Sequence, residues 1–167
     1  MVLALAKEIA LRKSEFKDEV VETIYFGGGT PSRLGKNHWI QIFEALKPFL
    51  ESTTFIEITV EVNPDDVTED YLLFLKSLGV NRLSMGVQTF DSNLLMFMNR
   101  AHTAEESKNC LSVAMRYFDN ITIDLIYGIP GLTTKKWIEN IETALSFNIP
   151  HISSYALTVE PKTALDA

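Results

Sequence analysis

The sequence predicts an α/β fold in which strands alternate with helices, and three observations support this prediction. Short apolar runs recur along the chain, and segments with helical periodicity separate them. Glycine, proline or a helix-capping residue follows most runs. Polar residues lie toward the carboxyl ends of the runs, which meet at one edge of a parallel sheet. Since a complete eight-stranded barrel needs about 250 residues, the 167 residues predict part of a barrel or a doubly wound sheet, in a single domain over residues 1–167.

Helical periodicity predicts helices at residues 3–16, 36–49, 69–78, 91–98, 103–118 and 133–147. Apolar runs predict strands at residues 22–26, 55–62, 82–88, 120–127 and 151–158. Because strands and helices alternate after the first helix, the sheet is expected to be parallel with right-handed crossovers.

In the first half of the chain, residues at the ends of the helices and strands help to predict their bounds, in addition to periodicity. The first helix carries its charged residues mainly on one face, and the first strand runs into a glycine turn. Pro64 closes the second strand because proline cannot donate a ladder hydrogen bond. Thr68 caps the third helix, and Gly79 follows its last turn. The second helix is expected to bury Trp39, Ile40, Phe43, Leu46 and Phe49.

The elements of the second half carry similar signals. Thr103 and Glu106 form a capping box at the start of the fifth helix. Glycine and proline close the fourth strand, and Thr133 or Thr134 opens the last helix. These signals place each helix between two strands of the same sheet.

The composition excludes several classes of protein. The net charge is −7 and no basic block is present, which argues against a nucleic-acid surface. Cys110 is the only cysteine, so this chain has neither a disulfide framework nor a site with several cysteine ligands, and a reducing compartment is expected. The apolar start is short and is interrupted by Lys7 and Glu8, so we expect neither a signal peptide nor a spanning segment. The predicted location is cytoplasmic.

The stretch at residues 25–31 (YFGGGTP) stands where a strand pattern ends and a helical pattern begins. Three glycines admit positive φ and let backbone N–H groups approach a ligand. The adjacent helix start favours a carboxylate or phosphate. The alternative is a glycine-rich connector with no ligand, because a lone glycine run is a weak motif.

Side-chain alternation gives the middle strands one apolar and one polar face. The apolar face carries Ile58, Val60, Val62, Leu83, Met85, Val87, Ile121, Ile123 and Leu125. The polar face carries Thr59, Glu61, Asn63, Ser84, Gly86, Gln88, Thr122 and Asp124. Since a packed barrel interior prefers branched apolar residues, the polar face predicts a wet or ligand-filled concavity.

Five strand ends contribute ligand-type residues to one edge, namely Gly28, Glu61, Gln88, Asp124 and Tyr155. Ligands bind at this edge in barrels and in open parallel sheets. The alternative is that Glu61 and Asp124 form internal ion pairs with Arg82 or Arg100, because an unpaired buried carboxylate is costly.

Six stretches occur in a fixed order: YFGGGTP (25–31), EVNP (61–64), SMGVQTF (84–90), NRAH (99–102), DLIYGIP (124–130) and SYAL (154–157). Together they resemble the radical SAM family of oxygen-independent coproporphyrinogen III oxidase and heme chaperone HemW. Arg100 and His102 favour the HemW branch. The resemblance implies a partial (β/α)6 barrel of the TIM-barrel type that binds S-adenosylmethionine at the carboxyl edge of its strands.

The resemblance assigns cofactor contacts to Gly28, Gly29, Thr30, Glu61, Gln88, Arg100, Asp124 and Ala156. The glycine turn would hold the methionine end, and the polar side chains would contact ribose hydroxyls or the amino group. Arg100 would contact a carboxylate through its fork of donors. Ala156 would be a small residue beside the cofactor.

The sequence departs from the family pattern in its cysteines. The family's first strand carries a CxxxCxxC-type motif that holds a [4Fe-4S] cluster, whereas Cys110 lies in a helix and is expected to be a small buried hydrophobe. The chain therefore resembles an internal fragment or truncated product that lacks this motif and the family's C-terminal region. No catalytic residue and no metal ligand are assigned.

Three functions follow from the resemblance. The first is a segment of a radical SAM enzyme of heme biosynthesis, related to coproporphyrinogen oxidase and inactive alone. The second is a heme chaperone without oxidase activity, with a tetrapyrrole partner, heme as a further ligand and His102 as a candidate contact. The third is an inactive remnant that self-associates through an exposed strand edge.

Overall fold

A computed structural model describes residues 1–17, 19–50, 57–159 and 161. Its single five-stranded sheet is parallel throughout, and its strand order β1-β2-β3-β4-β5 follows the chain. The strands are β1 (Thr23–Phe26), β2 (Glu57–Val62), β3 (Arg82–Gln88), β4 (Asn120–Tyr127) and β5 (His151–Ala156). This order confirms the barrel-like alternative, because a doubly wound sheet reverses its strand order.

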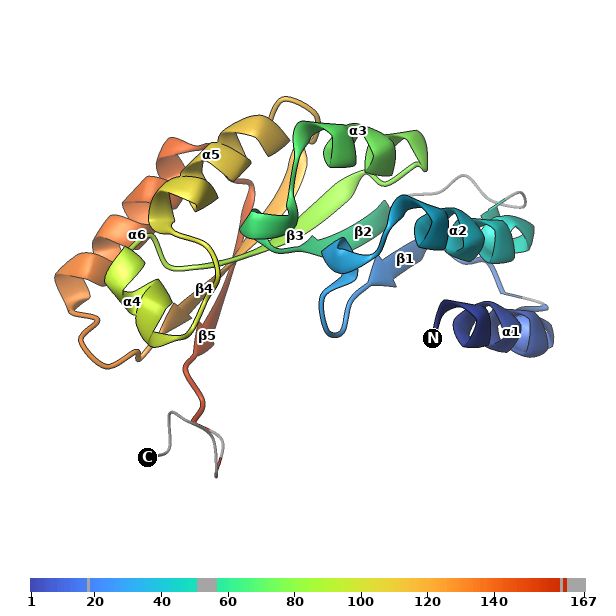
Figure 1. The fold of residues 1–167 in the computed structure, drawn as a ribbon, viewed down its shortest axis with the longest axis horizontal. Coiled ribbons are helices and arrows are strands. Elements are labelled where there is room, and N and C mark those ends of the chain that lie inside the picture. Colours follow the sequence, from blue (N-terminus) through green and yellow to red (C-terminus); the bar gives the residue numbers. More distant parts are fainter. Residues whose placement is uncertain (18, 51–56, 160, 162–167) are drawn as a thin grey trace.

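The α-helices are α1 (Val2–Arg12), α2 (Lys36–Leu50), α3 (Glu69–Ser77), α4 (Ser92–Phe97), α5 (Ala104–Ala114) and α6 (Thr134–Ser146). Short 3-10 helices are η1 (Lys13–Phe16), η2 (Pro31–Arg33) and η3 (Pro64–Asp66). Figure 1 shows α2, α3, α5 and α6 in an arc along one side of the sheet, with α1 beside α2. The predicted sequence of one helix followed by five strands with helices between them is confirmed.

The predicted caps are confirmed. The Thr68 hydroxyl accepts a hydrogen bond from the Tyr71 N–H, and Thr103 with Glu106 forms the complete capping box. Thr133, rather than Thr134, caps α6. Gly79 follows α3 with φ +93°, which a glycine adopts without strain.

Several details differ from the sequence prediction. The helix predicted over residues 3–16 is α-helical only to Arg12 and continues as the 3-10 helix η1 to Phe16. Ile40 is 45% exposed, whereas Ile42 is buried, because the inward stripe of α2 passes through Trp39, Ile42 and Phe43 and Ile40 is about 100° from Trp39. The fifth helix ends at Ala114 instead of residue 118, since three-residue turns replace the helical bonds there. The last strand ends at Ala156 instead of residue 158, and the first two residues of the predicted strand at 55–62 lie outside the described residues.

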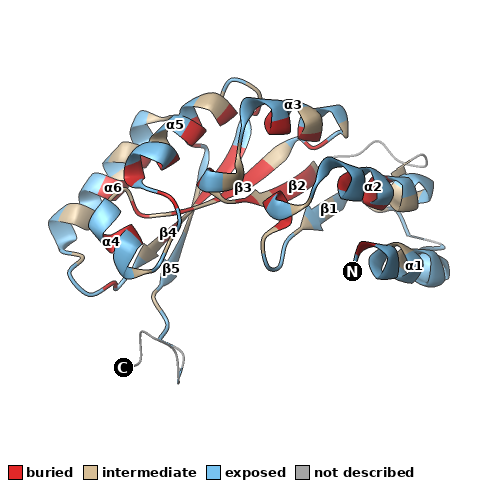
Figure 2. Cartoon of the chain, in the orientation of Figure 1, coloured by how far each residue is buried: buried red, intermediate tan, exposed pale blue. Residues whose placement is uncertain are grey.

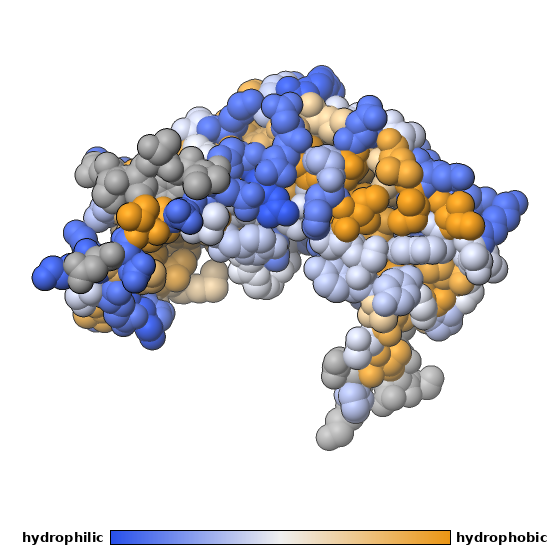
Figure 3. Space-filling model, turned by 180° about the vertical axis from the view of Figure 1, so that it is seen from behind, coloured by the Kyte–Doolittle hydropathy of each residue, from blue (hydrophilic) through white to orange (hydrophobic). Residues whose placement is uncertain are grey.

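The core lies between the sheet and the helices on its outer side. All nine apolar-face residues of β2, β3 and β4 are at most 3% exposed. Figure 2 shows the burial running along these strands and the inward sides of α2, α3 and α5. The opposite face is polar, as predicted, and the space-filling view shows the molecule hollowed on the side away from α3 and α5 (Figure 3).

Both ends of the sheet are open in the part of the chain that the structure describes. Strands β1 and β5 each pair with one neighbour only, so the barrel is incomplete. Within the same residues, none of the helices has both the length and the apolar character needed to cross a bilayer.

Candidate functional site

A cavity of about 190 Å³ lies at the carboxyl ends of β2, β3 and β4, beside the glycine turn. Six of the eight residues predicted to contact the cofactor line it, namely Gly29, Thr30, Glu61, Gln88, Arg100 and Asp124. The carboxyl edge of the sheet thus brings together residues that are up to 95 positions apart in the sequence. A larger hollow of about 360 Å³ between α1, β1 and α2 has a mainly apolar lining that contains none of the eight. Another of about 500 Å³ lies between α1, α2 and the outer side of the glycine turn, where Gly28, Gly29 and Thr30 meet mainly apolar residues.

The glycine turn uses its three glycines in two different ways. Gly28 and Gly29 have φ values of +81° and +69°, the left-handed region that favours glycine. Gly27 is needed for space, since a Cβ there would lie 2.7 Å from Cε1 of Tyr25 and 2.9 Å from Oε1 of Glu61. The glycine run in the sequence indicated the need for positive φ. The need for space at Gly27 could not be seen there, because it depends on a contact with Glu61 of β2.

Glu61 is held at the turn by two hydrogen bonds. Its carboxylate accepts from the Tyr25 hydroxyl at 2.8 Å and from the Gly28 N–H at 3.2 Å. Burial, and next the hydrogen bond to Glu61, raise the pKa of Tyr25, so the phenol stays protonated and donates at neutral pH. Gly28 itself lines the neighbouring hollow beside α1 and not this cavity, to which only its hydrogen bond with Glu61 connects it.

The predicted alternative of internal ion pairs is wrong. Arg82 pairs with Glu57 at 3.2 Å and donates to the Thr122 hydroxyl at 2.6 Å, nearer the amino ends of the strands. Arg100 donates to Asn63 Oδ1 at 2.9 Å and to the Gly86 carbonyl at 3.4 Å. Among the described residues, neither arginine forms an ion pair with Glu61 or Asp124, so both carboxylates face the cavity without a cation between them.

The two carboxylates make one wall of the cavity strongly acidic. Burial, and then the charge of Glu61, raise the pKa of Asp124 above its usual range, while the Ser153 hydroxyl and the more distant His151 and Arg82 lower it less. A cation or a group of N–H donors placed between Glu61 and Asp124 would relieve this repulsion. The Arg100 guanidinium also lines the cavity, and its remaining N–H groups have no hydrogen-bond partner among the described residues.

Gln88 ends β3 in an unusual conformation. Its φ is +69°, and the pairing of β3 with β4 shifts register between Met85 and Gln88. A non-glycine residue in this region costs energy and is frequent at functional sites. The bend brings the Gln88 side chain to the cavity.

Two residues that support this bend were missed by the sequence prediction of the site. Asn140 of α6 is 3% exposed, and its side chain accepts from the Phe90 N–H at 2.7 Å and donates to the Thr89 hydroxyl at 3.0 Å. Gly86 leaves room for its neighbours, since a Cβ there would lie 2.9 Å from Gln88 Nε2 and 3.3 Å from Arg100 Nη2. The one available signal was a polar residue on the apolar stripe of α6, three positions after Trp137.

Other predicted residues lie apart from the cavity. Ala156 ends β5 opposite Tyr127 and does not line it. Tyr155 is 57% exposed on the sheet face that carries Asp124. The His102 side chain is buried with both ring nitrogens facing protein groups, so it offers no surface to a heme.

Cys110 is buried in α5 as predicted. Burial, and then the charge of Asp65, raise the pKa of its thiol to about 12, so it remains protonated at neutral pH. Among the described residues, no group of three histidine, cysteine or acidic side chains is placed to hold a metal ion. The residues of this chain do not fit a [4Fe-4S] cluster, which needs cysteine thiolates.

Comparison with known proteins agrees with the architecture. The sequence profile described as "Radical SAM superfamily" matches residues 3–144. Similar curated proteins include heme chaperone HemW of Bacillus subtilis, 41% identical over 145 residues that cover 86% of this chain and 38% of the relative. HemW of Synechocystis is 35% identical over 166 residues, which cover 99% of this chain and 40% of the relative.

Solved structures with a similar fold include relatives of the same kind. Coproporphyrinogen III oxidase (HemN) from Escherichia coli is 32% identical with a TM-score of 0.83, over 95% of this chain and 37% of that one. Elp3 of Methanocaldococcus infernus, at 17% identity and a TM-score of 0.75 over 95% of this chain and 43% of that one, shares the fold. The chain spans about two fifths of the length of these relatives.

Proposed function

This chain belongs to the radical SAM superfamily, and we propose that it binds S-adenosylmethionine at the carboxyl edge of its sheet. One observation carries the proposal, which is that two carboxylates and one guanidinium line the same cavity beside the glycine turn. The amino acid end of S-adenosylmethionine is a zwitterion. Its ammonium group matches the side of Glu61 and Asp124, and its carboxylate matches the Arg100 fork.

The remaining predicted contacts divide the ligand between the cavity and the open sheet face. A volume of about 190 Å³ is below the ~300 Å³ at which ligand pockets usually begin. We therefore place the methionine end and part of the ribose in the cavity, near Gly28, Gly29 and Thr30. Gln88 would contact the ribose or the amino group, and the adenosyl part would extend along the polar face toward the carboxyl end of β5, where Ala156 is the last residue of the strand.

The task of this chain is to bind and orient the cofactor. In the radical SAM family a [4Fe-4S] cluster supplies the electron that cleaves the sulfonium, and this chain has only one cysteine, whose thiol is buried and protonated. We propose no catalytic residue here. Any radical chemistry would need cluster ligands from elsewhere.

Heme trafficking is the proposed setting, with heme biosynthesis as the alternative. Similar curated proteins are named heme chaperone HemW, and one similar solved structure is coproporphyrinogen III oxidase (HemN). A tetrapyrrole is the proposed partner in both settings. Heme titration distinguishes them: stoichiometric heme binding with a Soret band supports the chaperone, and its absence with oxidation of coproporphyrinogen supports the enzyme.

Self-association through the edge of β1 is a further proposal. Within the described residues this strand has a strand partner on one side only, and an apolar hollow lies beside it. Multi-angle light scattering over a hundredfold range of concentration should show a dimer or larger species. A monomer at every concentration would rule this out.

The cofactor proposal is tested by isothermal titration of S-adenosylmethionine into the chain. Glu61→Gln should weaken binding about tenfold or more, because a hydrogen bond to a charged group contributes about 1.5–3 kcal/mol. Asp70→Asn is the matched control, since Asp70 pairs with Lys36 and is 82% exposed away from the cavity. Absence of saturable binding, or equal loss in both variants, would contradict the proposal.

A further inference from the structure

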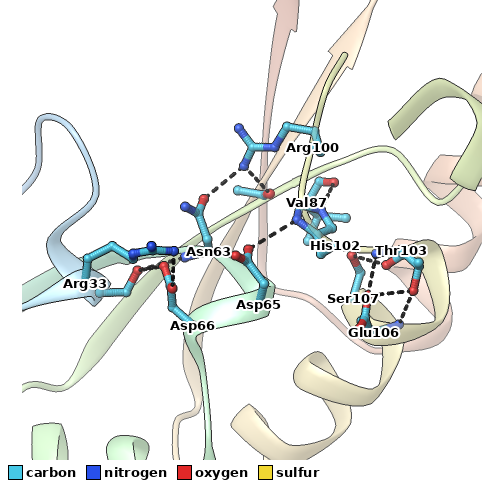
Figure 4. A network of polar contacts seen from close by, with 12 residues as sticks. Arg33, Asn63, Asp65, Asp66, Val87, Arg100, His102, Thr103, Glu106 and Ser107 are labelled. Carbon is cyan, nitrogen blue, oxygen red and sulfur yellow. Dashed lines mark hydrogen bonds and ion pairs between the residues drawn. The ribbon is translucent and has the colours of Figure 1, made fainter. Parts of the chain in front are cut away.

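Three adjacent polar side chains at η3 reach three different parts of the site (Figure 4). They belong to Asn63, Asp65 and Asp66, which follow directly after β2. Asp65 and Asp66 do not line the cavity. Their contacts point instead to the segments that do.

Asp66 connects η3 to the end of the glycine turn. Its carboxylate accepts from the Ser32 hydroxyl at 2.8 Å and pairs with Arg33 at 3.2 Å. Ser32 is buried, and its oxygen also accepts from the Asn63 N–H at 3.3 Å. The turn that presents Gly29 and Thr30 is therefore tied to η3 at its far end.

Asp65 connects η3 to the bend at the end of β3 through His102. The His102 side chain is fully buried, and its Nε2 lies 3.2 Å from the Val87 carbonyl. Its Nδ1 lies 3.6 Å from Asp65 Oδ1, a packing contact that is too long for a hydrogen bond, and has no hydrogen-bond partner among the described residues. Val87 directly precedes Gln88, the residue with φ +69°. The imidazole thus contacts the peptide that determines where Gln88 points.

Asn63 makes the third connection. It accepts from Arg100 at 2.9 Å, and Arg100 also reaches the Gly86 carbonyl. The segment from Arg100 to His102 consequently joins the end of β2 to the end of β3 at two points.

We propose that η3 is a positioning hub, in which Asp65, Asp66 and His102 fix the spacing of the glycine turn and Gln88 for the ligand. The hub acts through two separable arms. Asp66 holds the glycine turn, and Asp65 with His102 holds the β3 bend. The ligand identity rests on the proposed binding of S-adenosylmethionine, whereas the two arms can be tested without any ligand.

Amide hydrogen exchange of the ligand-free chain, followed by mass spectrometry, tests the arms. Asp66→Asn should accelerate exchange about tenfold at residues 28–33 and leave residues 88–91 unchanged. His102→Asn, which cannot reach the Val87 carbonyl, should do the reverse, and His102→Gln should restore protection because its amide can replace Nε2. Asp70→Asn should change neither segment.

The outcomes are distinct. Loss of amide protection confined to the expected segment, with protection restored by His102→Gln, supports the hub, whatever the cofactor titration shows. Uniform acceleration across the core strands, or no change in either segment, overturns it. If His102→Asn does not fold, Ser32→Ala tests the Asp66 arm alone, and unchanged exchange at residues 28–33 overturns the hub. Titration of S-adenosylmethionine into the same variants then separates failure of the hub from failure of the proposed function, since the hub predicts weaker binding only if the wild-type chain binds.

Discussion

Gly27→Ala should disturb the ligand contacts while leaving the fold nearly intact. The added Cβ would lie 2.7 Å from the Tyr25 ring and 2.9 Å from the Glu61 carboxylate, both inside van der Waals contact. These atoms are the outer ends of side chains that face solvent, so they can move without displacing the backbone. Glu61 would then leave the Gly28 N–H at 3.2 Å and the Tyr25 hydroxyl at 2.8 Å.

The magnitude follows from the displaced carboxylate. A hydrogen bond to a charged group contributes about 1.5–3 kcal/mol, and exposure places the stability cost near the lower end of this range. A ligand group that relies on Glu61 loses a similar amount, so affinity should fall about tenfold or more. The expected result is a large change in affinity with a small change in the free energy of unfolding.

Isothermal titration with S-adenosylmethionine and urea unfolding measure the two quantities on the same samples. Gly35→Ala is the control, because a Cβ at Gly35 would meet no atom within 4 Å. Binding by Gly27→Ala that equals the wild type would refute the reasoning. So would an equal loss of affinity in the control.

Three further predictions concern Asp124, Asn140 and Cys110. Burial and the charge of Glu61 raise the pKa of Asp124 in the native state, so the native state holds this proton more tightly than the unfolded chain does. The ionised Asp124 therefore lowers the free energy of unfolding once the pH rises above the pKa that this group has in the unfolded chain, about 4. Asp124→Asn should therefore raise the melting temperature at pH 7 and lose this advantage below about pH 4; a lower melting temperature at pH 7 would contradict this. Asn140→Ala leaves the Phe90 N–H without its acceptor and should cost about 1–3 kcal/mol in urea unfolding, and a cost below about 0.5 kcal/mol would speak against its role at the bend. The Cys110 thiol should resist Ellman's reagent at pH 8 until the chain unfolds, because burial raises its pKa to about 12, and rapid labelling of the native chain would disprove its burial.

The sequence was sufficient for the order of the elements and for the two faces of the sheet. Alternation along β2, β3 and β4 identified every apolar-face residue that is buried, because a strand has a fixed period of two. The buried residues of α2 were predicted less accurately. Ile40 and Ile42 are both apolar, and Ile42 is the one that lies on the inward stripe with Trp39 and Phe43, which pack against Phe26 of β1.

The site residues that were missed depend on contacts between distant segments. Gly27 and Gly86 are required because Glu61 and Arg100 approach them, and no local signal in the sequence reports that approach. Asn140 lies about fifty positions from the bend that it supports. His102 was predicted as a candidate heme contact, whereas its ring is buried against the Val87 carbonyl, fifteen positions earlier in the chain.

Chemical-shift mapping of the ¹⁵N-labelled chain with S-adenosylmethionine tests the central claim most directly. The proposed site predicts that the largest shifts occur at Gly29, Gln88 and Arg100, which line the cavity at the carboxyl edge, and at Gly28, whose N–H donates to Glu61. Shifts confined to Leu5, Ile9 and Phe49, around the apolar hollow beside α1, would contradict it.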